Sequence, residues 1–252
     1  MVSITDHRFD DLDYEAFRAL AGDPGLSRHE KVGFPDSYRE GREEAIFHDV
    51  VAKLASLQRP GARVIEVGPG CSRMPVMLAE RCAEMRSELT WVDSAEMLAL
   101  LPDAPHVHKV AGRFPQALQP RLHELTGGVD TIVAYSVVQY VFGEGNLYQF
   151  LDTCLALLAS GGELLIGDVP NQTMRKRFFA SPAGVATHRR HTGSSAVPEV
   201  HFNRLEPGQM DDSVVLAVLA RARAQGFHAW VVPQAVSLPM ANRREDILIR
   251  CP

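Results

Sequence analysis

Apolar residues recur in short runs along the chain from residue 63 onward, and stretches with helical spacing separate these runs. Short apolar runs bounded by turn residues predict buried strands, whereas apolar positions three and four apart predict helices. The predicted strands read RVIEVG, LTWVD, HVHKVAG, VDTIVAYS and GELLIGDV, with helices expected at about 72–86, 94–101, 115–125 and 146–158. Strands alternating with helices predict right-handed crossovers, and therefore a doubly wound, mainly parallel α/β sheet.

The two ends of the chain extend this pattern. Residues 37–57 carry apolar side chains at helical spacing, which predicts a helix, so we expect residues 1–60 to form an N-terminal helical extension or lid before an α/β domain at 61–252. A further helix is expected at about 211–225, followed by FHAWVVPQAV and EDILIRC as two strands. About ten residues separate these strands, too few for a crossover helix, so they are expected to pair as an antiparallel C-terminal hairpin.

Residues 170–208 interrupt the alternation. The stretch is rich in Pro, Gly, Ser, His and Arg and shows little periodicity. Such composition predicts an irregular excursion, and long loops of this kind are often functional. We therefore expect a substrate-side insertion above the strand ends.

Composition and charge exclude several classes of partner. A formal net charge of -5 provides no broad basic field for a nucleic-acid backbone, so nucleic acid is not expected as a partner. No apolar run reaches the length of a membrane span, and MVSITDHRFDDLDYEAF lacks the basic start and apolar core of a signal peptide. We expect a cytoplasmic protein without membrane insertion. The four cysteines lie far apart without CxxC spacing, so we expect reduced thiols and no metal.

The segment VIEVGPGCS predicts a ligand-binding turn. Gly68 and Gly70 follow the first strand, where open α/β sheets bind ligands, and the next helix offers free N–H groups. A dinucleotide-binding turn requires a third glycine where this chain has Arg73, whereas S-adenosylmethionine (SAM) enzymes usually have glycine where it has Ser72, a small substitute. Asp93 ends the second strand, where both cofactor families place a carboxylate for ribose hydroxyls.

The motifs WVDSAEML, VDTIVAYSVVQYV and LLASGGELLIGD resemble, in order and spacing, those of the class I SAM-dependent methyltransferases. The resemblance covers roughly residues 61–168 and implies a Rossmann-like methyltransferase fold, with SAM as cofactor and S-adenosylhomocysteine (SAH) as product. It also implies a set of cofactor-binding residues at the strand ends, namely Glu66, Gly68, Gly70, Ser72, Asp93, Ser94, Met97, Gly112, Arg113, Tyr135 and Ser136. Arg113 is a departure, because the family often has an acidic residue near this position that bonds the adenine amino group.

A second resemblance concerns residues 29–51, HEKVGFPDSYREGREEAIFHDVV. This segment resembles one found ahead of the cofactor domain in methyltransferases of bacterial surface-polysaccharide (O-antigen-like) biosynthesis. The resemblance implies a small-molecule acceptor that is a sugar or nucleotide sugar with a hydroxyl or amino group.

A hydroxyl acceptor must lose a proton and an amine must arrive neutral, so a base that titrates near working pH would help. The candidate catalytic residues are His191, His201 and Asp168. The candidate substrate-binding residues are Tyr38, Arg39, Gln139, Tyr140 and Asn171. Each has an alternative interpretation: the histidines as surface residues of a loop, Asp168 as the cap of a turn, and Tyr140 as part of the core.

Three functions remain open at this point. The first is transfer of a methyl group from SAM to an oxygen or nitrogen of a small molecule. The second is an NAD(P)-dependent oxidoreductase, which Arg73 and the final hairpin disfavour. The third is a non-catalytic, methyltransferase-like binding subunit.

Overall fold

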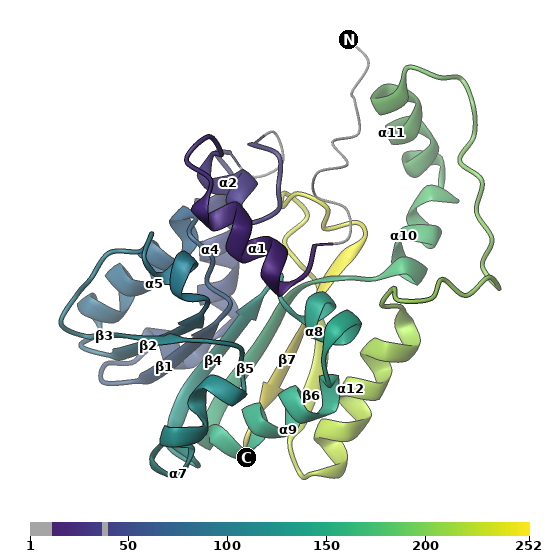
Figure 1. Ribbon diagram of the computed structural model, residues 1–252. Coiled ribbons are helices and arrows are strands. Elements are labelled where there is room, and N and C mark those ends of the chain that lie inside the picture. The colour runs from purple at the N-terminus through teal and green to yellow at the C-terminus, as the bar shows by residue number, and fades with distance from the viewer. Residues whose placement is uncertain (1–11, 37–39) are drawn as a thin grey trace.

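The computed structural model describes residues 12–36 and 40–252, which fold around one seven-stranded sheet with the order β3-β2-β1-β4-β5-β7-β6 (Figure 1). The strands are β1 (Arg63–Val67), β2 (Glu88–Asp93), β3 (Val107–Ala111), β4 (Val129–Tyr135), β5 (Leu158–Pro170), β6 (His228–Val232) and β7 (Arg244–Arg250). The first five strands pair in parallel, and β7 pairs antiparallel with both β5 and β6. The predicted α/β class, mainly parallel sheet and antiparallel C-terminal hairpin are confirmed.

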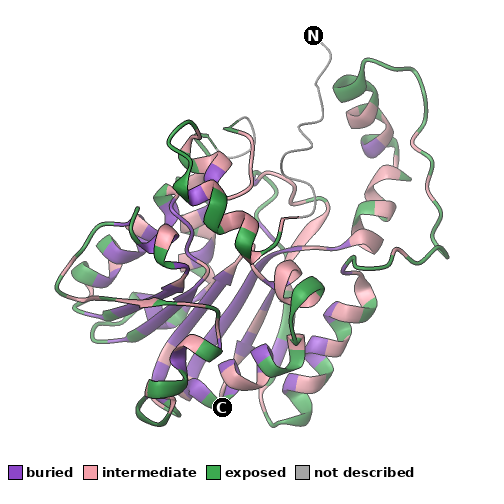
Figure 2. Cartoon of the chain, in the orientation of Figure 1, coloured by how far each residue is buried: buried purple, intermediate pink, exposed green. Residues whose placement is uncertain are grey.

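Two helical layers cover the sheet, and successive strand residues face opposite layers. On one face, α4 (Glu43–Lys53) and α5 (Arg73–Glu84) pack with Val64, Val133 and Leu165 in one buried cluster. On the other face, α9 (Leu147–Leu157) and α12 (Asp212–Ala224) pack with Ile65 and Ile132 in another. Figure 2 shows the consequence, since the central strands are mostly buried, whereas the edge strands β3 and β6 and the outer sides of the helices are partly exposed. Burial on both faces explains why the strands appear in sequence as continuous apolar runs.

The N-terminal part places two helices, α1 (Tyr14–Gly22) and α2 (Arg28–Lys31), over the carboxyl ends of the strands (Figure 1). Ser27 and Glu30 form a capping box at the start of α2, which satisfies two otherwise free backbone donors. The helix predicted over 37–57 is observed as α4 and a 3-10 turn, η2 (Ala55–Gln58). Because α4 belongs to the cover of the sheet, the expected N-terminal extension is continuous with the core at its end.

The central helices are shorter than expected. The stretch 94–101 contains only α6 (Ala95–Leu98), and 115–125 is split into η3 (Gln116–Arg121) and α7 (Leu122–Leu125). Pro120 lies inside η3, where its missing N–H interrupts a regular α-helix. An additional helix, α8 (Val138–Glu144), follows β4.

The prediction that residues 170–208 are irregular is wrong for much of this segment, which contains α10 (Gln172–Phe179) and α11 (Pro182–Thr192). Asn171 and Ser181 cap their N-termini, and Gly193, with φ of 68°, ends α11. Figure 1 shows that the pair projects away from the sheet. Because these helices do not cover the sheet, α10 buries none of its residues and α11 buries only Gly184, so neither needs the many apolar residues that reveal a helix in sequence.

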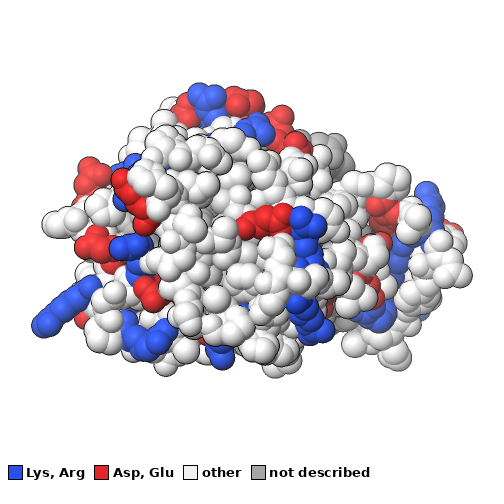
Figure 3. Space-filling model, turned by 90° about the horizontal axis from the view of Figure 1, so that it is seen from below, with Lys and Arg blue, Asp and Glu red and all other residues white. Residues whose placement is uncertain are grey.

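The surface carries both signs of charge. On the face shown in Figure 3, basic and acidic side chains are interspersed among uncharged residues. Within the described part of the chain, no helix combines the length and apolarity needed to cross a membrane.

Candidate functional site

A cavity of about 500 Å³ opens at the carboxyl ends of β1, β2 and β4. This volume lies within the usual range for small-molecule sites. Most of the residues expected to bind cofactor line it, together with one of those expected to bind substrate: Glu66, Gly68, Gly70, Ser72, Asp93, Met97, Gly112, Arg113, Tyr135, Ser136 and Tyr140. The sheet topology explains this arrangement, because parallel strands bring their carboxyl ends to one edge.

The glycine turn fits tightly between two other segments. Gly68 and Gly70 have φ of 65° and 63°, the left-handed conformation that favours glycine. A Cβ added to Gly68 would lie 2.6 Å from Val137 Cγ2, and one added to Gly70 would lie 2.5 Å from Val32 Cγ1. Both the backbone conformation and the space therefore require glycine, and Val32 places the N-terminal segment directly against the turn.

Two carboxyl groups belong to the cavity wall, that of Glu66 buried and that of Asp93 half-buried. Glu66 accepts a hydrogen bond from Trp91 Nε1 at 2.8 Å, and burial raises the pKa of its carboxyl to about 8. Asp93 Oδ2 accepts from the Gly70 N–H at 3.0 Å, and Oδ1 accepts from the Ser94 N–H at 2.6 Å. Burial raises the pKa of Asp93 to about 6, although the two backbone donors oppose this effect. A cation in the cavity would favour the ionised form of both groups.

Arg113, which lines the cavity, forms an ion pair with another lining residue, Glu144. The Arg113 guanidinium lies 3.5 Å from Glu144 Oε2 and 4.4 Å from the ring centre of Tyr14. Arg113 therefore occupies the loop after β3 without neutralising Glu66 or Asp93. This pairing also shows how the chain accommodates the residue that departs from the usual methyltransferase pattern.

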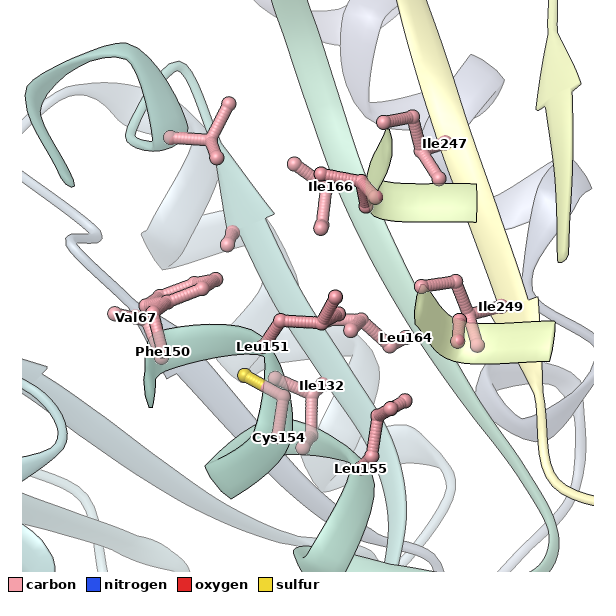
Figure 4. Close-up of a cluster of buried hydrophobic side chains, with 14 of the residues drawn as sticks. Val67, Ile132, Phe150, Leu151, Cys154, Leu155, Leu164, Ile166, Ile247 and Ile249 are labelled. Carbon is pink, nitrogen blue, oxygen red and sulfur yellow. The ribbon is translucent and has the colours of Figure 1, made fainter. Parts of the chain in front are cut away.

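Aromatic and apolar side chains form two parts of the cavity wall. Phe17 of α1 packs edge-on against Tyr140, with ring centres 4.9 Å apart, so Tyr140 both lines the cavity and holds α1. Val67 and Phe150 line the opposite side and belong to the buried cluster drawn in Figure 4. The cavity is therefore continuous with the core at its base, which favours a poorly hydrated interior.

His29 and Glu43 line the cavity but were not among the candidate residues. His29 Nδ1 lies 2.9 Å from Asp36 Oδ1, and His29 Nε2 lies 3.2 Å from Glu43 Oε2. Glu43 Oε1 accepts a hydrogen bond of 2.7 Å from the Arg73 N–H at the start of α5. Both residues fall within the 29–51 segment that resembles methyltransferases, and this was the only sequence signal for them.

The histidines predicted to be catalytic lie elsewhere. His191 is exposed on α11, and His201 is exposed and within 2.8 Å of Glu199. No residue of 170–208 is among the described residues that line the cavity. The arrangement favours the surface interpretation of these histidines, because α10 and α11 turn away from the strand ends.

Asp168 and Asn171 have structural partners at the end of β5. Asp168 is buried, accepts from Ser136 Oγ at 2.5 Å and pairs with Arg244 at 2.9 Å, so it contacts the cavity wall through Ser136. Asn171 accepts from the Met174 N–H and caps α10. Neither is among the described lining residues.

The remaining candidates support the wall or lie outside the described residues. Ser94 caps α6 by accepting from the Met97 N–H at 3.2 Å. Gln139 donates to the Ser136 carbonyl at 2.9 Å and is absent from the described lining. Tyr38 and Arg39 belong to the residues that the structure does not describe.

The described residues contain neither a cluster suited to a metal ion nor a thiol with a lowered pKa. Over residues 12–36 and 40–252, no group of three or more His, Cys, Asp or Glu side chains is arranged to hold a metal ion. Cys71, at the glycine turn, is buried, and burial raises its thiol pKa to about 11. A thiol with a raised pKa is a poor nucleophile, which agrees with a packing role.

Comparison with known proteins identifies the fold. No family model matches the chain. One curated relative, described as the probable non-canonical nonribosomal peptide synthetase CymA of Salinispora arenicola, is 28% identical over 167 residues, which are 62% of this chain and 2% of that protein. Among solved structures, the plantazolicin methyltransferase BpumL in complex with SAH matches with a TM-score of 0.55 and 12% identity over 94% of this chain and 96% of that one. The CurJ carbon methyltransferase matches with a TM-score of 0.52 and 16% identity over 85% of this chain and 56% of that one. The chain therefore has the fold of the class I SAM-dependent methyltransferases.

Proposed function

We propose that this protein transfers a methyl group from SAM to an oxygen or nitrogen of a small-molecule acceptor. The observation that carries the proposal is the cavity at the glycine turn, whose wall contains two carboxyl groups, those of Glu66 and Asp93, that have no cationic side-chain partner among the described residues. SAM offers a sulfonium, an ammonium and ribose hydroxyls, which these carboxylates could bind. The match in fold to a methyltransferase crystallised with SAH supports the same ligand.

Each residue of the cavity wall would contact a different part of the cofactor. Asp93 would accept hydrogen bonds from the ribose hydroxyls, Gly68 and Gly70 would allow close approach of the cofactor, and Glu66 would provide negative charge for the amino-acid end. The cofactor supplies an activated methyl group when it binds. The chain then has to align an acceptor and exclude water, which suits a cavity whose floor is formed by Val67 and Phe150.

For the acceptor we propose a small molecule with a hydroxyl or amino group. The named relatives, a nonribosomal peptide synthetase and a plantazolicin methyltransferase, favour a peptide-like natural product. The resemblance of residues 29–51 favours a sugar or nucleotide sugar. Both classes therefore belong in an acceptor panel.

The first experiment is a thermal-shift series with SAM, SAH, NAD and NADP, followed by calorimetry. A ligand at 100 times its dissociation constant stabilises the native state by about 2.7 kcal/mol, which raises the melting temperature measurably. We expect a shift with SAM and SAH only, and a loss of at least about tenfold in SAH affinity for Asp93→Asn. His48→Asn, an exposed residue of α4, is the matched control. A shift with a dinucleotide alone would contradict the proposal.

The second experiment separates an enzyme from a binding subunit. The protein is incubated with methyl-labelled SAM and a panel of amino and hydroxyl compounds that includes short azole peptides and nucleotide sugars. We expect label in at least one acceptor class, and several-fold less with Asp93→Asn at a SAM concentration near the dissociation constant of the wild type. SAH binding without label in any acceptor would favour the non-catalytic alternative.

A further inference from the structure

The cavity extends past Asp93 to the end of β3. The Gly112 N–H donates to the Asp93 carbonyl at 2.8 Å, so the loop that follows, with Arg113 and Phe114, lies directly beside the end of β2. Both residues of this loop line the cavity. The proposed function places the amino-acid part of the cofactor at the glycine turn and its ribose at Asp93, and the nucleobase then extends toward this loop.

This end of the cavity has side chains suited to a planar base. Met97 is 2% exposed and, like Phe114, presents apolar atoms that can pack against the faces of a ring. Phe114 is itself held edge-on against Phe150, with ring centres 5.2 Å apart. The edge of adenine carries an amino group, which donates hydrogen bonds and requires an acceptor. Arg113 cannot supply this acceptor, because a guanidinium only donates.

A carboxylate of the cavity wall lies beside this loop. Four carboxyl groups belong to the described lining, namely Glu43, Glu66, Asp93 and Glu144. Glu66 and Asp93 lie at the ends of β1 and β2, and Glu43 Oε1 accepts from the first N–H of α5, after the glycine turn. Glu144 ends α8, and its Oε2 is 3.5 Å from Arg113 Nη1. Glu144 is therefore the carboxylate of the described lining that pairs with the loop after β3.

Glu144 is held through one of its two oxygens. Its Oε2 accepts from the Tyr14 N–H at 3.3 Å and pairs with Arg113. Tyr14 also lies close to the ribose end of the cavity, since burial and then the Asp93 carboxylate raise the pKa of its hydroxyl. No described residue donates a hydrogen bond to Glu144 Oε1, and the side chain is 27% exposed. The second oxygen can therefore accept from a ligand while the first stays anchored.

We propose that Glu144 recognises the nucleobase of the cofactor. Its Oε1 accepts a hydrogen bond from the exocyclic amino group of adenine, while Arg113 and the Tyr14 N–H hold the carboxylate through Oε2. Arg113 is a positioning residue, because it acts on the base through Glu144. The assignment rests on the proposed function and makes the cavity selective for an amino-bearing purine. A purine with a carbonyl at that position would turn one acceptor toward another, with no hydrogen to share.

The test compares SAH with S-inosylhomocysteine, in which a carbonyl replaces the amino group of adenine and the rest of the molecule is unchanged. Calorimetry measures the dissociation constant of each ligand at pH 7 for the wild type and for Glu144→Gln. We expect the wild type to bind SAH at least about tenfold more tightly, because a hydrogen bond to a carboxylate is a strong one. In Glu144→Gln this ratio should fall to about threefold or less, because the amide can accept from the amino group or donate to the carbonyl.

The matched control is Glu124→Gln, which should keep the ratio of the wild type. Glu124 also forms an ion pair with an arginine, Arg121, at 3.6 Å, and lies outside the described lining. If Glu144 only held α1 in place, its substitution would weaken both ligands equally, and an unchanged ratio overturns the assignment. A wild type that binds both ligands equally also overturns it but leaves the proposed function intact. Failure of SAH to bind the wild type overturns the proposed function and this assignment with it.

Discussion

Glu66 offers a direct way to measure how the cavity responds to a cation. Its carboxyl is buried, accepts a hydrogen bond from Trp91 Nε1 and has a pKa raised to about 8. At pH 7 the unliganded protein therefore holds Glu66 mainly in its neutral form. Binding of a cation favours the carboxylate, so SAM is expected to release a proton from Glu66 as it binds.

The size of this effect follows from the pKa. If bound SAM lowers the pKa of Glu66 below 6, raising the pH from 6 to 7 increases the population of the binding-competent carboxylate about tenfold, equivalent to about 1.4 kcal/mol of binding free energy. Close to one proton should be released per SAM at pH 7. In Glu66→Gln this part of the pH dependence disappears, while Gln can still accept the Trp91 hydrogen bond.

The raised pKa of Glu66 also predicts that the stability of the unliganded protein falls as the pH rises. Because the folded pKa of Glu66 lies above its unfolded value of about 4.5, its contribution to stability is complete below that value and is lost as the pH rises through about 8. Asp93 contributes in the same direction, mainly up to about pH 6. Between pH 6.5 and 8.5, the melting temperature of the wild type should therefore fall more steeply than that of Glu66→Gln.

The assay is calorimetric titration of SAM at pH 6, 6.5 and 7, in buffers with different ionisation enthalpies to count the released protons. Glu163→Gln is the matched control, because Glu163 is also buried but pairs with Arg250 and does not belong to the described cavity lining. An unchanged pH dependence in Glu66→Gln, or no proton release by the wild type, would refute the reasoning.

Two further predictions concern stability and are measured by urea denaturation. Gly70→Ala should cost at least about 1–2 kcal/mol, because it combines a left-handed backbone with a Cβ 2.5 Å from Val32, whereas Gly61→Ala meets open space and should cost less. Equal losses of unfolding free energy in the two variants would show that Val32 moves away from the added Cβ at no cost. Asp246→Ala should cost about 3 kcal/mol or more, because it removes the acceptor of the buried Asp168 N–H and Gln234 amide and one of the two carboxylate partners of Lys53. A loss below about 1 kcal/mol would contradict that estimate.

The alternation of apolar runs and helical stretches was sufficient to predict the sheet. Neighbouring residues such as Val64 and Ile65 face opposite helical layers, so both must be apolar, and this requirement is visible in sequence. The turn around Gly68 and Gly70 was equally visible, because a backbone in the left-handed region requires a particular residue type.

The helices of segment 170–208 could not be predicted in the same way. Asn171 and Ser181 cap the two helices of this segment, but from sequence Asn171 was a candidate substrate-binding residue and the surrounding composition indicated a loop. Helices that cover no sheet can carry many polar residues, and the Arg, Lys and His residues of α10 and α11 gave this segment the composition of a loop. Their direction away from the cavity then decided that His191 lies far from the candidate site.

The sequence by itself determined the fold class, the hairpin and the candidate glycine turn, because each depends on local patterns of burial and backbone conformation. Only the tertiary structure decided which ionisable groups share the cavity. His29, Glu43, Glu66 and Asp93 come from four separate segments, and they line one cavity because α2 and the first residue of α4 lie near the carboxyl ends of the strands. The shifted pKa values of Glu66 and Asp93 have the same origin, since burial acts through three-dimensional surroundings that no single stretch of sequence contains.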